Sequence, residues 1–220
     1  MQNGWKGAVK LRVNADAMTL YAVTDRTWVK DTTLMDQVKE ALEGGITFLQ
    51  LREKHLSKEE FIKEAREMKE LSKEYKVPFV INDNIEVALA VDADGVHIGQ
   101  DDMSVEEARK LLGEDKIIGV SAHNVEEAIK AQKGGADYLG VGATSTKKDA
   151  NVVSKEEIKK ICHTVEIPVV AIGGIKKENI KTLEGTDVDG VAVVSAIFAA
   201  KDIKKDTKQL RSLVEEMKQK

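Results

Sequence analysis

The sequence has few of the residues on which several common protein classes depend. A single cysteine, Cys162, occurs among 220 residues, which excludes an internal disulfide framework and a multi-cysteine metal site. We expect Cys162 to be a small buried apolar residue. Only two prolines are present, and no Pro/Ser-rich linker divides the chain. Aromatic residues make up 4% of the chain, so Val, Ile, Leu and Ala must form most of the core.

An excess of charge of one sign is also missing, as are long apolar runs. The chain has 34 Lys and Arg against 38 Asp and Glu, a net charge of −4, so a basic surface for nucleic acid is not expected. Apolar runs such as residues 190–200 are too short to span a membrane. Residues 1–14 lack the apolar centre of a signal peptide. These features indicate a cytoplasmic protein with no membrane or nucleic-acid partner, and the length fits a single domain.

What the chain does contain is an alternation of short β-branched runs with charged, helix-patterned segments. The runs are nearly continuous in apolar residues, which is typical of parallel strands covered on both faces. Pro78 and Pro168 each stand at the first position of a run, where a missing N–H is tolerated. The expected strands are Leu20–Thr24, Thr47–Leu51, Pro78–Asn82, Gly95–Gly99, Ile117–Ser121, Tyr138–Val141, Pro168–Ile172 and Val191–Ser195.

Helices are predicted between these runs from 3.6-residue periodicity and capping signals. Ser57, Ser104 and Ser154 each precede a Glu by three residues, the pattern of a capping box. Pairs of glycine at 44–45 and 134–135 predict left-handed helix ends. The expected helices are Leu34–Glu43, Lys58–Tyr75, Ile85–Val91, Val105–Leu112, Val125–Lys133, Lys155–Thr164, Lys177–Leu183 and Thr207–Met217.

Eight strand–helix units leave two architectures, an open doubly wound sheet or a closed eight-stranded barrel. A dinucleotide-binding sheet should have G-x-G-x-x-G after its first strand, and here that strand runs into Thr24-Asp25-Arg26. The pattern therefore favours an α/β protein with a single (β/α)₈ TIM barrel domain. We assign residues 18–220 to the barrel and residues 1–17 to an N-terminal extension.

Polar side chains collect where the expected strands end, and in such a barrel the chemistry lies at that rim. These side chains come from seven strand ends that are far apart in the sequence. Exposure to solvent alone does not explain why so many polar groups gather at one rim. We therefore expect a ligand site there. The rim residues are Gln50, Arg52, Lys54, Asn82, Asp83, His97, Gln100, Asp101, Asp102, Ser121, His123, Thr144, Ser145, Thr146, Lys147, Lys148, Gly173, Gly174 and Ser195.

The types of these residues indicate phosphorylated ligands. Arg52, Lys54 and Lys147 are cationic donors suited to phosphate oxygens. Asp83 and Asp102 are hard oxygen ligands of the kind that hold Mg²⁺ beside a diphosphate. No Cys or His cluster offers a zinc site.

Two glycine- and serine-containing turns after the last two strands predict a second anionic site. The segments Ile172–Ile175 and Val194–Ala196 occupy the usual position of a backbone phosphate pocket in such barrels. A plain tight turn at the glycine pair is the alternative. Two phosphorylated substrates joined with loss of diphosphate would use both sites.

Seven motifs, in order from about Met18 to about Ala200, resemble the thiamine-phosphate synthase family, also called thiamine-phosphate pyrophosphorylase. None is decisive alone, but seven in register are highly specific. They are Gln50-Leu51-Arg52-Glu53-Lys54, Ile81-Asn82-Asp83, His97-Ile98-Gly99-Gln100-Asp101-Asp102, Gly119-Val120-Ser121, Thr144-Ser145-Thr146-Lys147, Gly173-Gly174 and Val194-Ser195.

The resemblance implies a Mg²⁺-dependent transferase in thiamine biosynthesis. It would join a hydroxymethylpyrimidine diphosphate to a hydroxyethylthiazole phosphate, giving thiamine phosphate and diphosphate. Diphosphate would leave first, and the thiazole nitrogen would capture the resulting carbocation. Small-molecule substrates and a homo-oligomer are the partners expected.

The same resemblance implies a role for each motif residue. Arg52, Lys54, Ser121 and Lys147 would be catalytic, and Asp83 and Asp102 would bind the metal. The substrate-binding set would be Gln50, Leu51, Arg52, Glu53, Lys54, Asn82, Ser121, Thr144, Ser145, Thr146, Lys147, Gly174, Val194 and Ser195.

One segment departs from the family pattern. After the sixth expected strand the family usually has a few more residues, often with an aromatic and a proline, before Thr-x-Thr-Lys. Here Gly142-Ala143 runs directly into Thr144, so the loop is about three residues short. A barrel that only binds a thiamine precursor or a partner is therefore one alternative.

A related thiazole tautomerase, which moves a proton without magnesium, is the other alternative. His123 would then be the general base, because an imidazole titrates near neutrality. Such an enzyme has no use for a diphosphate-binding set, which favours the synthase. Release of diphosphate with and without Mg²⁺ separates the three hypotheses.

Overall fold

The computed structural model describes residues 12–142 and 153–219. Its strands and helices alternate along the chain as the sequence predicts. The strands are β1 (Leu20–Val23), β2 (Phe48–Leu51), β3 (Phe79–Asn82), β4 (Gly95–Ile98), β5 (Ile117–Ala122), β6 (Tyr138–Gly142), β7 (Val169–Ile172) and β8 (Gly190–Val193). The α-helices are α1 (Leu34–Gly44), α2 (Lys58–Glu74), α3 (Ile85–Ala90), α4 (Val105–Leu112), α5 (Val125–Gly134), α6 (Lys155–Thr164), α7 (Ser195–Phe198) and α8 (Ile203–Lys218). Short 3₁₀ helices are η1 (Ala15–Met18), η2 (Arg26–Trp28) and η3 (Ile180–Leu183).

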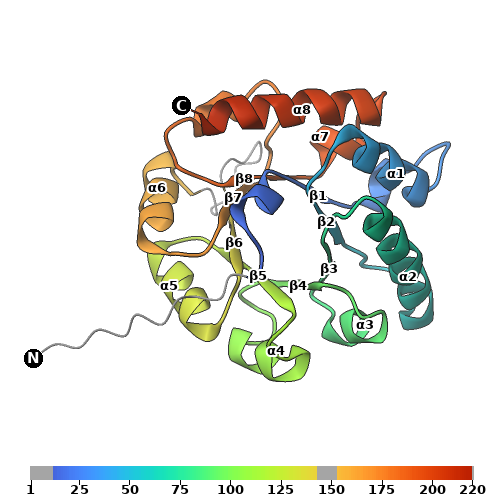
Figure 1. Ribbon diagram of the computed structural model, residues 1–220, viewed down its shortest axis with the longest axis horizontal. Coiled ribbons are helices and arrows are strands. Elements are labelled where there is room, and N and C mark those ends of the chain that lie inside the picture. The colour runs from blue at the N-terminus through green and yellow to red at the C-terminus, as the bar shows by residue number, and fades with distance from the viewer. Residues whose placement is uncertain (1–11, 143–152, 220) are drawn as a thin grey trace, which may run out of the picture.

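The strands form a closed barrel in which each strand pairs in parallel with the next and β8 pairs with β1. Helices surround the strands (Figure 1). Closure leaves no sheet edge, and the crossover between consecutive strands returns the chain to the same end of the barrel, so every strand points the same way. The prediction of a (β/α)₈ barrel is confirmed.

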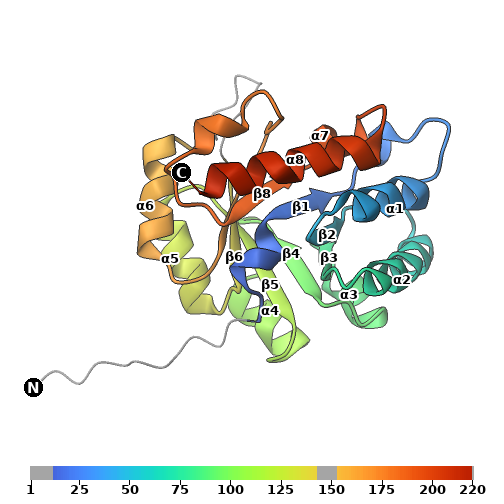
Figure 2. The same cartoon turned by 45° about the horizontal axis from the view of Figure 1, so that its top comes forward.

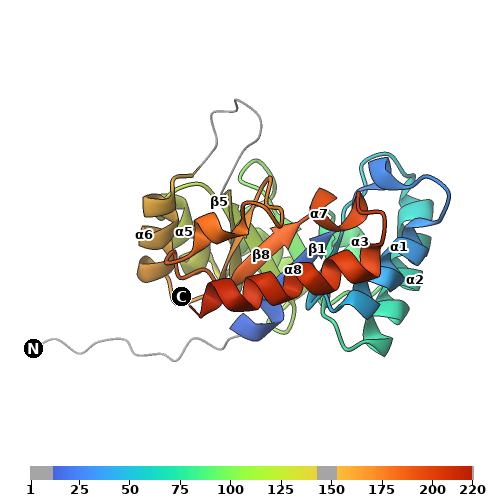
Figure 3. The ribbon, with the colours of Figure 1, turned by 90° about the horizontal axis from the view of Figure 1, so that it is seen from above.

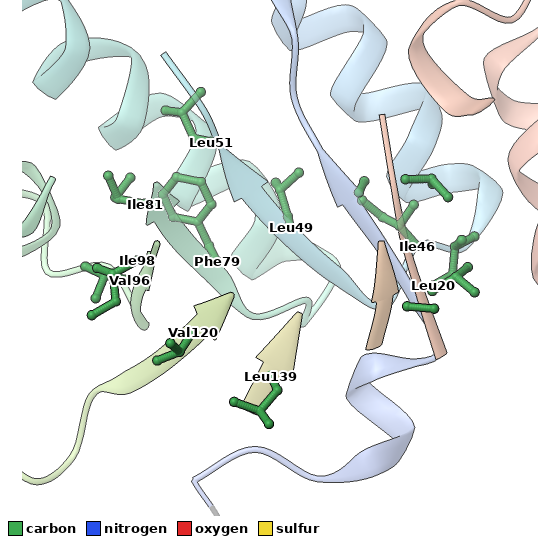
Figure 4. Close-up of a cluster of buried hydrophobic side chains, with 14 of the residues drawn as sticks. Leu20, Ile46, Leu49, Leu51, Phe79, Ile81, Val96, Ile98, Val120 and Leu139 are labelled. Atoms are coloured by element: carbon green, nitrogen blue, oxygen red, sulfur yellow. The ribbon is translucent and has the colours of Figure 1, made fainter. Parts of the chain in front are cut away.

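Aliphatic side chains fill the layer between the barrel and its helices. Alternate residues of each strand point outward, among them Leu49, Leu51 and Ile81, which are fully buried (Figure 4). The long helix α8 lies across β8 and β1 beside α1 (Figure 2). At the close approach of these helices Gly44 is required, because a Cβ there would lie 2.6 Å from the Cβ of Thr207.

The inward-facing side chains form a second, smaller core inside the barrel. Tyr21, Phe48 and Tyr138 meet there edge to face, with ring centroids 4.7–5.8 Å apart. Gly119 makes room for this cluster, because a Cβ at that position would lie 2.0 Å from Cζ of Tyr138. The barrel interior is therefore packed with side chains.

Residues 12–17, which the sequence assigned to an extension, pack beneath the barrel. Val13 is 4% exposed and belongs to the inner core. Arg12 and Arg109 hold the two oxygens of the buried Asp137 carboxylate at 2.8 and 2.7 Å. In Figure 3 the dark blue turn of η1 lies below the strands. The described part of this segment is thus continuous with the barrel floor.

The ends of several elements differ from the prediction. The segment 177–183, expected as an α-helix, forms only the 3₁₀ helix η3. The eighth strand ends at Val193, and Ser195 begins α7 instead of ending a strand. Helix α8 starts at Ile203, four residues before the predicted start at Thr207, with Asp202 as its N-cap.

Two of the three predicted capping boxes are confirmed. Ser57 and Ser104 form reciprocal capping boxes with Glu60 and Glu107. Ser154 caps α6, but the Glu157 carboxylate accepts a bond from the Val125 N–H instead of completing a box. Helices α1 and α5 end at glycines 45 and 135, both left-handed.

Candidate functional site

The carboxyl ends of the strands meet at one rim of the barrel, because all the strands are parallel. Figure 3 shows this end of the barrel with α7 beyond the end of β8. Side chains at the ends of β2, β3, β4 and β5 that the sequence singled out lie at this rim. They are Gln50, Arg52, Lys54, Asn82, Asp83, Asp102 and Ser121.

Asp83 and Asp102 face each other at the ends of β3 and β4. Partial burial and the negative charge of Asp102 raise the pKa of Asp83 to about 6, against the opposing influence of Asn82 and Arg52. The Asn82 amide donates to the Asp83 carboxylate, and Asp102 accepts from the Gly99 N–H at 2.7 Å. Two facing carboxylates repel each other, and a shared cation relieves that repulsion.

The backbone at Asp83 is in the left-handed region, with φ of 59°. This conformation costs a residue other than glycine roughly 1 kcal/mol, and it is maintained by the bond from the Asp83 N–H to the His97 carbonyl at 2.8 Å. Strain of this kind concentrates at functional sites. The strained backbone holds the carboxylate at the rim instead of along the strand.

The basic segment after β2 lies against the end of β1. The Arg52 N–H donates to Thr24 Oγ1 at 2.9 Å. Partial burial opposes ionisation of Asp25, but hydrogen bonds from Thr27 and the charges of Arg52 and Lys54 lower its pKa. A hollow of about 580 Å³, lined by Arg52, Lys54 and Asp25 among others, opens here. Its volume is in the range of small-molecule sites.

Two side chains of the Gln50–Lys54 motif are engaged elsewhere. Leu51 points away from this hollow, and Glu53 forms an ion pair. Leu51 points outward into the layer beneath α2 and is fully buried, so only its backbone faces the barrel. The Glu53 side chain is 4% exposed and binds Arg26 at 2.9 Å, and Arg26 also binds Glu64 at 2.6 Å. The Glu53 carboxylate therefore anchors the basic segment to η2.

Three residues inside the barrel link the two walls of the site. The sequence singled out His97 as a rim residue but not Tyr21 or Tyr138. Tyr21, Tyr138 and His97 connect Gln50 to Ser121 through hydrogen bonds of 2.5–3.0 Å. Burial lowers the pKa of His97 to about 4, against the influence of Asp102, so its imidazole is neutral. A signal was available, because a tyrosine buried in a barrel interior needs a partner for its hydroxyl.

The predicted phosphate cradle lies at the ends of β7 and β8. Gly173 and Gly174 have φ of 103° and 63°, a conformation that favours glycine. The Gly174 carbonyl accepts from the Asn179 amide at 2.9 Å. Val194 and Ser195 form the junction between β8 and α7 and are half-buried.

The remaining residues of the set, Thr144, Ser145, Thr146 and Lys147, lie outside the described residues, as does the short loop that precedes them. His123, the base of the alternative tautomerase, is exposed and bonds Glu127 through Nδ1 at 2.9 Å. Among the described residues, no group of three or more His, Cys, Asp or Glu side chains is arranged to hold a metal. A cation between Asp83 and Asp102 would therefore need further oxygen ligands from substrate or water.

Comparison with known proteins identifies the family. The family model described as thiamine monophosphate synthase matches residues 20–197. The chain belongs to the thiamine monophosphate synthase family. This assignment confirms the resemblance that the seven motifs carry, and with it the expected transferase of thiamine biosynthesis.

Individual members of the family are similar over nearly their whole length. A thiamine-phosphate synthase of Clostridium acetobutylicum is 52% identical over 198 residues, covering 89% of this chain and 94% of the relative. One from Methanobrevibacter smithii is 50% identical and covers 85% and 90%. The solved structure of thiamine phosphate pyrophosphorylase from Pyrococcus furiosus is 43% identical, with a TM-score of 0.85 over 92% of this chain and 98% of that one.

Helices long and apolar enough to cross a membrane are missing from the part of the chain that the structure describes.

Proposed function

We propose that this member of the family condenses 4-amino-2-methyl-5-(diphosphooxymethyl)pyrimidine with 4-methyl-5-(2-phosphooxyethyl)thiazole in a Mg²⁺-dependent reaction. The bond from the pyrimidine methylene to the diphosphate oxygen breaks, and a bond from that carbon to the thiazole nitrogen forms. Diphosphate and thiamine phosphate are the products. The observation that carries the proposal is the facing pair of carboxylates, Asp83 and Asp102, near the basic residues that follow β2.

The acidic pair fits a magnesium ion by the chemistry of its donors. Mg²⁺ prefers oxygen ligands and usually takes one or two carboxylates together with substrate phosphates and water. Asp83 and Asp102 supply those carboxylates, and their repulsion would fall when a divalent cation lies between them. When bound, Mg²⁺ supplies positive charge that stabilises the departing diphosphate.

The side chains around the acidic pair would hold the pyrimidine diphosphate. Arg52 and Lys54, at the end of β2, would bind diphosphate oxygens and stabilise the charge that develops as the bond breaks. The positive charge of Arg52 acts to lower the pKa of Asp83, so a diphosphate bound to Arg52 would lie near the acidic pair. Gln50, Asn82 and Ser121 would orient the pyrimidine ring and its methylene carbon.

The thiazole phosphate would bind at the opposite side of the rim. Backbone N–H groups of Gly174, Val194 and Ser195 would surround its phosphate oxygens. Thr144, Ser145 and Thr146 would complete this site, and Lys147 would contact the diphosphate. The roles of these four residues rest on the resemblance alone.

Measurement of diphosphate release tests the proposal. The full chain is incubated with both substrates, with and without Mg²⁺, and both diphosphate and thiamine phosphate are quantified. We expect equal amounts of the two products only when Mg²⁺ is present. Products at the same rate in EDTA would refute the role of the metal, and diphosphate without thiamine phosphate would refute the condensation.

A further inference from the structure

A chain of four hydrogen bonds crosses the interior of the barrel from one wall of the site to the other. Gln50 Nε2 lies 2.5 Å from the Tyr21 hydroxyl, which lies 2.8 Å from that of Tyr138. The Tyr138 hydroxyl lies 3.0 Å from His97 Nδ1, and His97 Nε2 lies 3.0 Å from Ser121 Oγ. The two tyrosines, His97 and Gln50 are each at most 7% exposed.

Glycines on the neighbouring strands leave room for this row of hydrogen-bonded side chains. Gly119 on β5 lies against the Tyr138 ring, and Gly140 on β6 lies near the His97 ring. A Cβ at position 140 would lie 3.3 Å from His97 Cε1, and one at 119 would overlap the Tyr138 ring. Burial raises the pKa of both tyrosines, so the hydroxyls keep their protons. The barrel is thus built around an ordered row of neutral polar groups.

Proton counting allows only two orders for this row. Each phenol has one proton, and a neutral imidazole has one N–H. If Gln50 donates to Tyr21, then Tyr21 donates to Tyr138, Tyr138 donates to His97 Nδ1, and His97 Nε2–H donates to Ser121. If the Gln50 oxygen accepts from Tyr21, every later bond reverses. Any other order leaves a buried hydroxyl proton without an acceptor, which costs about 1–3 kcal/mol.

The two orders present opposite patterns to a ligand. In the first, Gln50 offers its amide oxygen and Ser121 offers its O–H. In the second, Gln50 offers its NH₂ and Ser121 offers only oxygen lone pairs. A 4-aminopyrimidine has a donor amine beside an acceptor ring nitrogen, and its 4-oxo counterpart has an acceptor oxygen beside a donor N–H. In the structure Gln50 Nε2 donates to the Tyr21 hydroxyl, which is the first order. A ring held in a fixed orientation by its diphosphate therefore matches this order only in its 4-amino form.

We propose that Tyr21, Tyr138 and His97 are positioning residues that couple the hydrogen-bonding roles of Gln50 and Ser121, so that the site accepts the 4-amino ring and rejects the 4-oxo ring. This inference rests on the proposed function, because that function places the pyrimidine between Gln50 and Ser121. The row acts through those two side chains and does not itself take part in bond breaking.

The test compares kcat/KM for the two pyrimidine diphosphates, 4-amino and 4-oxo, at saturating thiazole phosphate and Mg²⁺. We expect the unmodified protein to prefer the amino substrate by at least about tenfold, the effect of one buried hydrogen-bond mismatch. Tyr138→Phe removes two bonds of the row and keeps the ring in the aromatic cluster. The preference should then fall to within about threefold of unity.

Tyr75→Phe is the matched control, because Tyr75 is the third tyrosine of the chain and lies at the end of α2. Its preference should equal that of the unmodified protein. An equal loss of both activities in Tyr138→Phe would show a merely structural role and overturn the proposal. So would a protein that makes thiamine phosphate without preferring the amino ring.

Two further measurements keep the proposal testable if the first variant does not fold. Tyr21→Phe interrupts the row at its other end and should lower the preference in the same way. Ser121→Ala is then combined with Tyr21→Phe. If the row couples Gln50 to Ser121, the double variant should lose less preference for the amino substrate than the product of the two single losses. A loss equal to that product would refute the coupling. If the unmodified protein makes no thiamine phosphate, the proposed reaction fails, and titration calorimetry of the two pyrimidine diphosphates then gives the preference directly.

Discussion

Replacing Asp83 by Asn should stabilise the fold while removing the magnesium-dependent activity. The asparagine keeps the side-chain shape, can still accept from Asn82 through its amide oxygen, and tolerates the left-handed backbone at this position. Alanine would add backbone strain at a φ of 59°. The substitution therefore removes a negative charge with little other change.

The expected gain in the free energy of unfolding follows from the pKa of Asp83, which is about 6 in the folded protein against an ordinary value of 3.8. Between these values the folded state holds a proton that the unfolded state has released, so stability falls as the pH rises from about 4 to about 6. A pKa difference of about 2 corresponds to at most about 3 kcal/mol. Asp83 lies at an exposed rim, and solvent screening reduces this to roughly 1 kcal/mol.

Thermal unfolding from pH 4 to pH 8 without divalent cations measures the effect. We expect Asp83→Asn to unfold about 2–4 °C higher at pH 7, with no difference at pH 4. Mg²⁺ should raise the unfolding temperature of the unmodified protein by mass action and leave the variant unchanged. Asp101→Asn, on an exposed turn next to the second proposed ligand Asp102, serves as the control for a removed charge.

Three results would refute this reasoning. One is a pH-independent stability difference, and another is an equal stabilisation of both proteins by Mg²⁺. The third is an Asp83→Asn variant that retains normal magnesium-dependent turnover.

Three further predictions concern the glycines and the loop after β6. Gly174→Val should weaken binding of the thiazole phosphate in calorimetry and leave the affinity for the pyrimidine diphosphate unchanged. The control Gly185→Val, at a similar φ of 74°, should change neither affinity. Equal losses of both affinities in Gly174→Val would show that the turn is merely structural. Gly119→Ala should lower the free energy of unfolding by about 3 kcal/mol, because the new Cβ overlaps Tyr138. Gly140→Ala should lower it less, because the closest contact of a Cβ there is 3.3 Å. Chemical denaturation measures both variants, and equal effects would contradict the packing argument. Three residues fewer remove roughly 10 Å of reach from the loop, so inserting three between Ala143 and Thr144, an aromatic and a proline among them, should raise the turnover rate; an unmodified chain that is already as fast would refute this.

The sequence by itself determined the architecture and the location of the site. Strands buried on both faces need near-continuous apolar runs, and eight such runs alternating with capped helices are compatible with few folds. Parallel strands place their carboxyl ends on one rim, so Arg52, Asp83 and Ser121 could be assigned to a common site from their positions after those runs. Helix capping could also be predicted from sequence, because Ser57 and Glu60 form their reciprocal hydrogen bonds within one helical turn.

Only the tertiary structure decided which polar groups meet. The repulsion between Asp83 and Asp102 depends on the register of β3 against β4, and no local pattern encodes that distance. The same holds for Arg26, which binds Glu53 and Glu64 from elements far apart in the chain. Tyr21 and Tyr138 are 117 residues apart and bond each other because closing the barrel brings β1 and β6 across its interior, and burial there requires each hydroxyl to find a partner.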